Sequence, residues 1–298
     1  MNGIILINKP QQYTSFDVVA VLRKLLKIKK IGHTGTLDPM ATGVLVLLIG
    51  NATRAADIIP NHNKSYKAEI KLGLFSDTGD IWGTVSENSY QKITEQQFKS
   101  AINKFKGNIM QVPPMFSAIK KDGVKLVDLA RQGIEIERKA RSVTIYDINI
   151  CSFNEHSQSG IFNADCSKGT YIRTLCTDIG EVLGCGAVMS SLIRTSACGF
   201  NLEDCITLDE ARELAEKGIL KERLIPVDRC FADYPSLNIS KNQGIRFNNG
   251  GFLNLDRLNK INDSDIYRIY SANKFLGLGK KDLDLKVLKV FKNFNEEK

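Results

Sequence analysis

Strand-like and helix-like segments interleave along this chain without the regular alternation that builds a parallel sheet. Tyr66–Leu72 alternates apolar and charged residues, which is the pattern of a half-exposed strand. Val143–Phe153 and Ile161–Cys166 look like neighbouring strands joined by a short turn. Strands paired through short turns favour a mixed, largely antiparallel central sheet flanked by helices. The fold class predicted from the sequence is therefore α+β.

Local signals predict the other elements of this domain. Two short apolar runs, Ile4–Ile7 and Val44–Ile49, read as buried strands. Thr14-Ser15-Phe16-Asp17 resembles a capping box, which marks the start of a helix. Helices are expected from Thr14 through about Leu26, from Thr94 through about Phe105, from the Lys168-Gly169 break to Gly184, and over Leu208–Lys217.

The chain divides into two predicted domains and one insertion. After Ile225-Pro226 the sequence predicts mainly short strands and turns, and the last of these strands is a basic one around Val287–Phe291. We therefore predict a first domain over residues 1–232 and a small β-rich domain over 233–298. Residues 113–141, called the basic insertion below, read as an excursion from the first domain with a short helix near Leu126–Arg131.

Charge is unevenly distributed along the 298 residues, whose net charge is +8. Residues 1–71 carry +6, the basic insertion +3 and residues 235–298 +5, whereas residues 142–234 carry −6. Separated basic segments suit a polyanion laid across a folded surface. Composition alone leaves open the alternative of a mildly basic protein with solvated surface charges.

Cysteine and histidine usage argues against a metal centre. The seven cysteines form no CxxC pair and no cluster with the three histidines. An odd number of scattered cysteines, without a recognisable secretion signal, indicates reduced thiols in a cytoplasmic protein. The longest apolar run, Val44–Ile49, is too short to span a bilayer. We expect no metal and no membrane association.

The stretch GHTGTLDPMATGVL, residues 32–45, contains the only acidic residue between Asp17 and Asp57. Its glycines allow the backbone to approach a substrate closely. Asp38 in such a loop suits nucleophilic attack or proton abstraction, although loop aspartates also commonly cap turns. A glycosidase would need a second carboxylate, and the chain has no GK[ST] sequence of a phosphate-binding Walker loop.

The stretch KGTYIRTL, residues 168–175, lies between a predicted strand and a predicted helix. Tyr171 and Arg173 would face the same way if the chain is still extended there. An arginine beside a buried carboxylate would keep it charged. Tyr66 and Tyr171, at strand ends, offer flat faces on which a base can stack; the alternative is that both are core aromatics.

Five motifs and one further short segment resemble one enzyme family. GHTGTLDPMATGVL is similar to the catalytic signature of the TruB-type tRNA pseudouridine synthases, the tRNA pseudouridine-55 synthases. The resemblance continues over nearly the whole chain, through ILINKPQQYTSFDVV, KSYKAEIKLGLFSDTGDIWG, PPMFSAIKKDGVKLVDLARQGIEIERKARSV, CSKGTYIRTLCTDIG and the segment Leu192–Thr195. It implies the pseudouridine synthase fold, with the basic insertion as an RNA-binding thumb and residues 233–298 as a PUA-like RNA-binding domain.

The resemblance implies roles for the matched residues. Asp38 would be the catalytic carboxylate, acting as nucleophile or base, paired with Arg173, and Tyr171 would lie against the base near the carbon that loses a proton. Three more residues would hold the flipped nucleotide: His33 where it leaves its loop, Tyr66 stacked on the uracil, and Leu192 on the ring's other side. RNA-binding cations would be Lys120, Lys121, Lys125, Arg131 and Arg141. Ile193 departs from the family, where many relatives carry a second arginine.

The implied activity is the isomerisation of uridine to pseudouridine at position 55, in the T-loop of tRNA, after the nucleotide has been flipped out of the loop. It requires no cofactor. The expected partner is the T-stem and T-loop of tRNA, with no obligatory protein partner, and the expected state is a cytoplasmic monomer. Two alternatives stay open: a non-catalytic RNA-binding protein or tRNA chaperone, and a related synthase with another RNA target.

Overall fold

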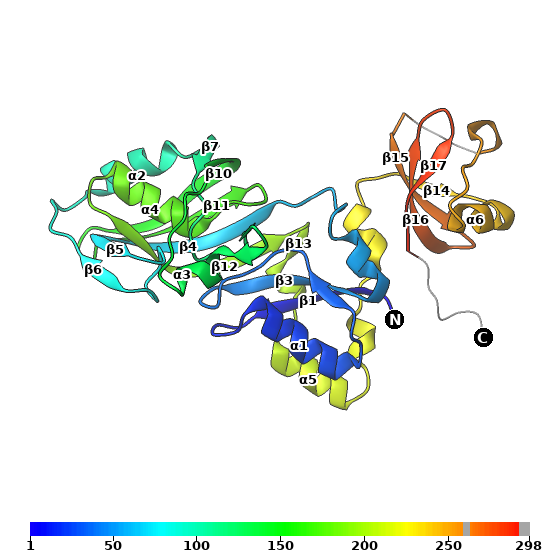
Figure 1. The fold of residues 1–298 in the computed structure, drawn as a ribbon, viewed down its shortest axis with the longest axis horizontal. Helices are drawn as coiled ribbons and strands as arrows, with labels where there is room; N and C mark the ends of the chain where they lie inside the picture. The colour runs from blue at the N-terminus through cyan, green and yellow to red at the C-terminus, as the bar shows by residue number, and fades with distance from the viewer. Residues whose placement is uncertain (259–262, 292–298) are drawn as a thin grey trace.

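A nine-stranded sheet forms the centre of the larger part of the molecule (Figure 1). The structure is a computed structural model, and it describes residues 1–258 and 263–291. The strands of this sheet are β1 (Gly3–Lys9), β2 (Ile31–His33), β3 (Thr42–Ile49), β4 (Lys64–Leu72), β7 (Gly107–Gln111), β10 (Arg141–Asn154), β11 (Ser159–Cys166), β12 (Ala187–Ala197) and β13 (Phe200–Asn201).

The strand order is β1-β3-β12-β4-β11-β10-β7, with β2 added to β3 and β13 to β12. Strands β3 and β12 pair in parallel over two residues, and the other pairs of this sheet are antiparallel. The prediction of a mixed, largely antiparallel sheet in an α+β fold is confirmed. Two small hairpins accompany the sheet: β5 (Leu74–Ser76) with β6 (Val85–Glu87), and β8 (Lys120–Lys121) with β9 (Val124–Lys125).

The helices of the first domain begin close to where the sequence predicts, whereas the helix over Lys241–Asn248 was not predicted. The helices are α1 (Ser15–Leu26), α2 (Glu95–Asn103), α3 (Leu126–Ala130), α4 (Ile172–Val182), α5 (Leu208–Glu216) and α6 (Lys241–Asn248), with 3-10 turns η1 (Gly50–Ala55), η2 (Leu202–Asp204), η3 (Leu220–Arg223), η4 (Val227–Phe231) and η5 (Leu255–Arg257). The capping box before α1 is confirmed, because the Thr14 hydroxyl accepts from the Asp17 N–H while the Asp17 carboxylate accepts from the Thr14 N–H.

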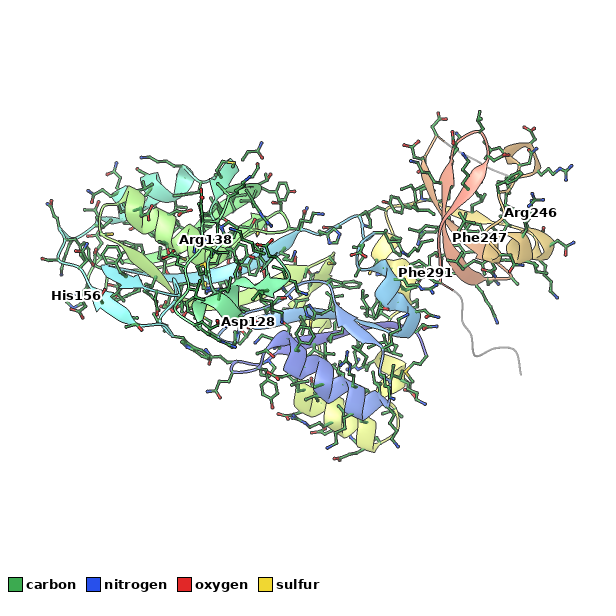
Figure 2. The ribbon with its side chains drawn as sticks, in the orientation of Figure 1. Asp128, Arg138, His156, Arg246, Phe247 and Phe291 are labelled. Atoms are coloured by element: carbon green, nitrogen blue, oxygen red, sulfur yellow. The ribbon has the colours of Figure 1, made fainter. Side chains whose placement is uncertain are left out.

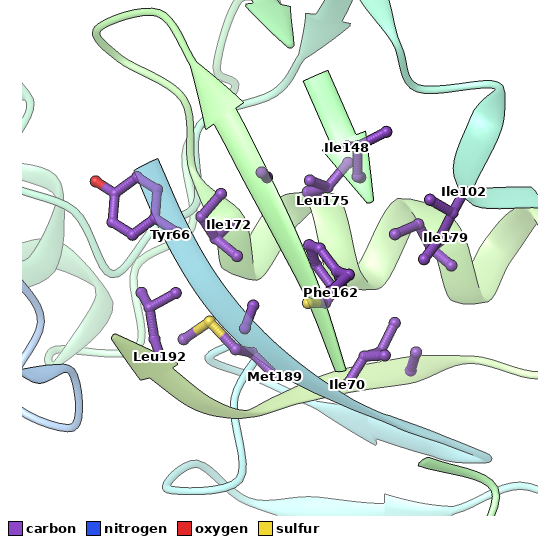
Figure 3. Packing of buried hydrophobic residues seen from close by; sticks show 14 of the residues in the cluster. Tyr66, Ile70, Ile102, Ile148, Phe162, Ile172, Leu175, Ile179, Met189 and Leu192 are labelled. Carbon is purple, nitrogen blue, oxygen red and sulfur yellow. The ribbon is translucent and has the colours of Figure 1, made fainter. Parts of the chain in front are cut away.

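The two halves of the sheet are covered differently. At the β1–β3 end, α1 and α5 pack on one face, and η1 with the segment around Phe231 packs on the other. At the β4–β11 end, α4 and α2 cover one face, where Phe162 and Ile179 lie in the core (Figure 3). On the opposite face of β4, Lys67 is exposed, which confirms the predicted alternation of this strand.

A four-stranded sheet follows the first domain: β14 (Ser236–Asn238), β15 (Ile266–Ser271), β16 (Lys274–Lys281) and β17 (Leu285–Val290), in sequence order. Its core includes Phe247 of α6, which Figure 2 labels beside Arg246. Phe231, fully buried, joins this sheet to the first domain, with ring centroids 6.4 Å from Phe275 and 5.9 Å from Phe291. The predicted C-terminal β-rich domain is therefore present, although residues 259–262 and 292–298 of it lie outside the described ranges.

Two further expectations concern the whole chain. All seven cysteines are free thiols. In residues 1–258 and 263–291 no helix is both long and apolar enough to cross a membrane.

Candidate active site

A cavity of about 460 Å³ opens beside Asp38. It lies where the loop after β2 meets the root of the basic insertion and the turn before α4. We call it the Asp38 cavity. Its lining residues are Thr34, Gly35, Thr36, Leu37, Asp38, His62, Lys64, Tyr66, Ser117, Ala118, Ile119, Lys168, Gly169, Thr170, Tyr171, Ile172, Arg173 and Leu192. Four of the sequence-predicted site residues, Tyr66, Tyr171, Arg173 and Leu192, thus share one cavity with Asp38.

Arg173 holds the Asp38 carboxylate with two parallel hydrogen bonds. Its Nε donates to Asp38 Oδ2 at 2.9 Å, and a terminal nitrogen donates to Oδ1 at 3.2 Å. The same guanidinium donates to the Thr78 and Phe116 carbonyl oxygens, each at 2.8 Å. Arg173 is 5% exposed and the Asp38 side chain 34% exposed. A planar guanidinium used in this way fixes both the position and the orientation of its carboxylate partner.

Arg173 reaches Asp38 from a helix and not from an extended segment. Tyr171 is the last extended residue, with φ −106° and ψ 111°, and α4 begins at Ile172. The prediction that Tyr171 and Arg173 face the same way depended on an extended chain at these residues, and that condition is not met. Tyr171 and Arg173 nevertheless line the same cavity.

Asp80 is a second acidic neighbour of Arg173 that the sequence analysis missed. Its Oδ2 lies 3.7 Å from Arg173 Nε, and its side chain is 9% exposed. The Thr78 hydroxyl and the Trp82 N–H donate to its Oδ1 at 2.9 and 3.0 Å. Arg173 is thus held between two carboxylates, one at the cavity and one behind it. Asp80 could have been found from the sequence, because it lies in the motif beginning at Lys64 that resembles the family.

Tyr66 and Leu192 come from the neighbouring strands β4 and β12. Figure 3 shows both at one end of the core, with the Tyr66 oxygen directed away from the packed aliphatic side chains. Burial raises the pKa of the Tyr66 phenol above its ordinary value, so the ring remains neutral. An aromatic face and an aliphatic side chain at the cavity can enclose a flat heterocycle.

Tyr171 is positioned through its backbone. Its N–H donates to Gln111 Oε1 at 3.0 Å, and its carbonyl oxygen accepts from Gln111 Nε2 at 3.2 Å. Gln111 is buried at the end of β7, so this side chain ties the turn before α4 to the edge of the sheet. Burial raises the pKa of the Tyr171 phenol.

Arg194 holds the loop that contains Asp38 by hydrogen bonds to backbone carbonyl oxygens. The sequence analysis did not identify this residue. Its guanidinium is buried and donates to the carbonyl oxygens of Val44, Gly35 and Thr36 at 2.7, 3.1 and 3.3 Å. Gly43, with φ +106°, allows the backbone of β3 to lie close to that of β12 at Arg194, because a Cβ on Gly43 would lie 2.2 Å from the Arg194 carbonyl oxygen. Arg194 lies in the matched segment Leu192–Thr195, in which the sequence analysis considered Ile193.

His33 lies at the end of β2, outside the lining of the Asp38 cavity. Its ring meets the edge of Phe16 at a centroid distance of 5.6 Å, and Phe16 is 64% exposed. Burial lowers the pKa of the His33 imidazole, and Arg194 lowers it further. A neutral ring beside an exposed aromatic is suited to apolar contact with a base.

The predicted RNA-binding cations of the basic insertion lie outside the Asp38 cavity, and all are exposed: Lys120, Lys121, Lys125, Arg131 and Arg141. Lys125 Nζ lies 5.8 Å from the centre of the Phe16 ring. The root of the insertion, Ser117–Ile119, does line the cavity. The insertion therefore joins an exposed basic surface to the wall of the site. Among the described residues, no three His, Cys, Asp or Glu side chains are grouped to hold a metal ion.

Comparisons with known proteins show the family of the chain. Residues 23–172 match the sequence model of the TruB family pseudouridylate synthase N-terminal domain, and residues 173–232 match that of the tRNA pseudouridylate synthase B C-terminal domain. The tRNA pseudouridine synthase B of Clostridium tetani is 45% identical over 293 residues, covering 97% of this chain and 99% of that protein. The Clostridium acetobutylicum protein of the same name is 46% identical over 281 residues, covering 94% and 95%.

Among solved structures, a crystal structure of a Cbf5-Nop10-Gar1 complex contains a similar chain. The TM-score is 0.73 at 27% identity, covering 97% of this chain and 85% of the other. A structure of an H/ACA RNP bound to a substrate RNA containing 2′-deoxyuridine matches with the same TM-score at 24% identity, covering 98% and 86%, and supports the fold.

Proposed function

The chain belongs to the TruB family of tRNA pseudouridine synthases, which are isomerases, and on that premise we propose that it converts uridine 55 in the T-loop of tRNA to pseudouridine, with Asp38 as the catalytic carboxylate. The observation that carries the proposal is the two-point contact between Arg173 and Asp38, residues 135 apart in the chain, at the wall of a cavity of about 460 Å³. A single oriented acid in such a cavity suits a reaction on one nucleoside.

The reaction moves a bond and changes no oxidation state. The bond between N1 of uracil and C1′ of ribose breaks, the base turns, and a bond forms between C5 and C1′. The proton on C5 leaves and N1 gains one, so the atoms balance without a co-reactant. Attack by Asp38 on C1′ and removal of a ribose proton both require an oriented carboxylate, and the two hydrogen bonds from the Arg173 guanidinium fix the orientation of this one.

The target base is inaccessible while it is stacked, so the proposal includes flipping the nucleotide into the Asp38 cavity at a cost of a few kcal/mol. Stacking on the Tyr66 ring contributes about 1–3 kcal/mol toward that cost, and Leu192 covers the other side of the ring. In this arrangement the neutral Tyr171 phenol lies near C5. His33, with Phe16 against it, occupies the place from which the nucleotide leaves its loop.

The remaining parts of the proposal concern the RNA and the domains. Residues 1–232 carry the reaction, the basic insertion contacts the T-stem, and the domain over 233–298 is PUA-like and adds RNA contacts. A-form RNA is held by phosphate and shape contacts more than by base readout. We propose a monomer that acts on tRNA in the cytoplasm and needs no protein partner.

The direct test is incubation with an unmodified tRNA transcript, followed by mapping of each pseudouridine to its position. We expect one new pseudouridine, at position 55. Pseudouridine at another position would support the related synthase with a different RNA target. Tight binding without any conversion would overturn the proposal and support the non-catalytic RNA-binding alternative.

A further inference from the structure

The Asp38 cavity is lined by two sets of basic side chains that differ in their partners. Arg173 is paired with Asp38 and Asp80. His62, Lys64 and Lys168 also line the cavity, and we call these three residues the cationic rim. Within the described part of the chain, none of these three side chains makes an ion pair with a carboxylate. The rim therefore carries two lysine ammonium groups that are not paired directly with a carboxylate.

The three rim residues act on one another. Burial lowers the pKa of the Lys64 ammonium, and the nearby positive charges of Arg194 and Lys168 lower it further. Burial also lowers the pKa of the His62 imidazole, with Lys168 and Lys64 adding to the effect and Asp57 opposing it weakly. A bound anion would stabilise the charged forms of these groups, because an opposite charge nearby favours the charged form.

The donors of the rim are available to a ligand. Lys64 Nζ donates to the His62 carbonyl oxygen at 2.9 Å, which uses one of the three hydrogens of its ammonium group. Lys168 is exposed, in the turn that precedes Gly169. Arg194 lies close by, since a Cβ on Gly35 would be 3.2 Å from Lys64 Cε and 3.6 Å from an Arg194 nitrogen. That guanidinium, however, is already bound to loop carbonyls.

We propose that His62, Lys64 and Lys168 form a subsite for one of the two phosphodiesters that flank the target uridine. This inference rests on the proposed function. Uracil and ribose are uncharged, so a flipped nucleotide can satisfy unpaired cations only through its phosphates. With the base between Tyr66 and Leu192 and the ribose at Asp38, the cationic rim is the part of the lining that can bind a phosphate through charge. The rim thus anchors the nucleotide through its charge, independently of the base.

The test pairs two variants with three RNAs. Lys168→Gln removes one rim charge, and Lys67→Gln removes the same charge from the exposed face of β4. Each protein is assayed with a T-arm hairpin that has natural linkages, or a neutral methylphosphonate on the 5′ or on the 3′ side of the target uridine. With natural RNA we expect Lys168→Gln to raise KM by roughly 5- to 10-fold with kcat little changed, and Lys67→Gln to change KM less than about 2-fold.

The methylphosphonate RNAs decide whether a specific phosphate is bound. One of the two RNAs should raise the wild-type KM by about the same factor as Lys168→Gln does on natural RNA. The same RNA should not raise the KM of Lys168→Gln any further, because the substitution and the neutral linkage remove the same interaction. If Lys168→Gln has its full effect on both neutral RNAs, or no larger effect than Lys67→Gln, the subsite is wrong. Failure of the wild type to convert the natural hairpin would contradict the proposed function instead.

Lys64→Gln provides a second arm with the same three RNAs. Because Lys64 is half-buried, its thermal unfolding midpoint is measured beside that of the wild type. One methylphosphonate RNA is expected to raise the wild-type KM but not the KM of Lys168→Gln. We expect that the same RNA does not raise the KM of Lys64→Gln either. Sensitivity to the other one would contradict a single shared phosphate.

Discussion

Two regions of the molecule are rich in charge: the part of the Asp38 cavity around Asp38 and Arg173, which we call its floor, and the basic insertion. They differ in how far their charged side chains are buried and bonded. At the floor, Arg173 is almost completely buried and donates hydrogen bonds to Asp38, Thr78 and Phe116. In the basic insertion, the lysines and arginines predicted to bind RNA are exposed, and the short helix α3 fully buries one residue, Leu126.

The difference separates two tasks. A buried and fully bonded charge has one position, so it can place a reacting group relative to a ribose carbon. Exposed charges on long side chains can adapt to a phosphate backbone but fix no geometry. We therefore expect changes at the floor to act on kcat and changes in the insertion to act on affinity. Three experiments examine this division, from the largest expected effect to the smallest.

The largest effect is expected for Asp38→Asn. The amide preserves the size of the side chain but cannot attack C1′ or accept a proton as a carboxylate does. Pseudouridine formation should fall below detection in a tritium-release assay from 5-tritiated uridine, while tRNA affinity measured by filter binding stays within several-fold of the wild type. Retained turnover would contradict the assignment of Asp38.

Arg173→Lys should lower kcat by roughly 10²- to 10³-fold. The ammonium keeps the charge but cannot reproduce the two-point contact with Asp38, and a small displacement of a catalytic group costs about 100-fold. Single-turnover kinetics at saturating enzyme separates this loss from binding. An effect confined to affinity would show that Arg173 acts on RNA and not on the carboxylate.

The smallest effect on catalysis is expected in the basic insertion. A triple variant changes three exposed lysines to glutamine: Lys120, Lys121 and Lys125. Binding to tRNA should weaken by roughly 10- to 100-fold, and the slope of log K against log salt should become shallower by about 0.7–0.9 for each phosphate that the protein no longer neutralises. Single-turnover kcat at saturation should change little.

The matched control for that triple variant removes three exposed lysines from the open face of β4, from the segment before α2 and from the end of α2: Lys67, Lys92 and Lys104. The control and the triple variant of the insertion have the same net charge. If the control weakens binding as much and flattens the salt dependence equally, the insertion has no special role, and overall charge drives the association.

Local signals predicted much of the fold. The Thr14 capping box marks the start of α1, and alternation in Tyr66–Leu72 identifies both faces of β4. Helix α6 was missed because its sequence is polar and contains Gly244. A signal was present there as well, since Ser240 and Gln243 form the same kind of capping box.

The site could be predicted only in part. Asp38 stands out locally as an isolated acid, but its pairing with Arg173 spans 135 residues and came from family resemblance. Asp80 and Arg194 were missed for a physical reason. Both act by bonds to backbone or to another side chain behind the cavity wall, and such roles depend on tertiary packing that no local pattern records.

The position of β12 in the sheet has a consequence for synthesis of the protein. This strand lies between β3 and β4, although it follows both in the chain. Until the ribosome has added Ala197, the β1–β3 pair and the β4–β11–β10–β7 group remain two separate pieces, each with an open edge toward the other. Arg194, which holds the Asp38 loop, arrives on that same strand. The nascent chain thus carries no assembled active site until the strand that joins the two pieces has been translated.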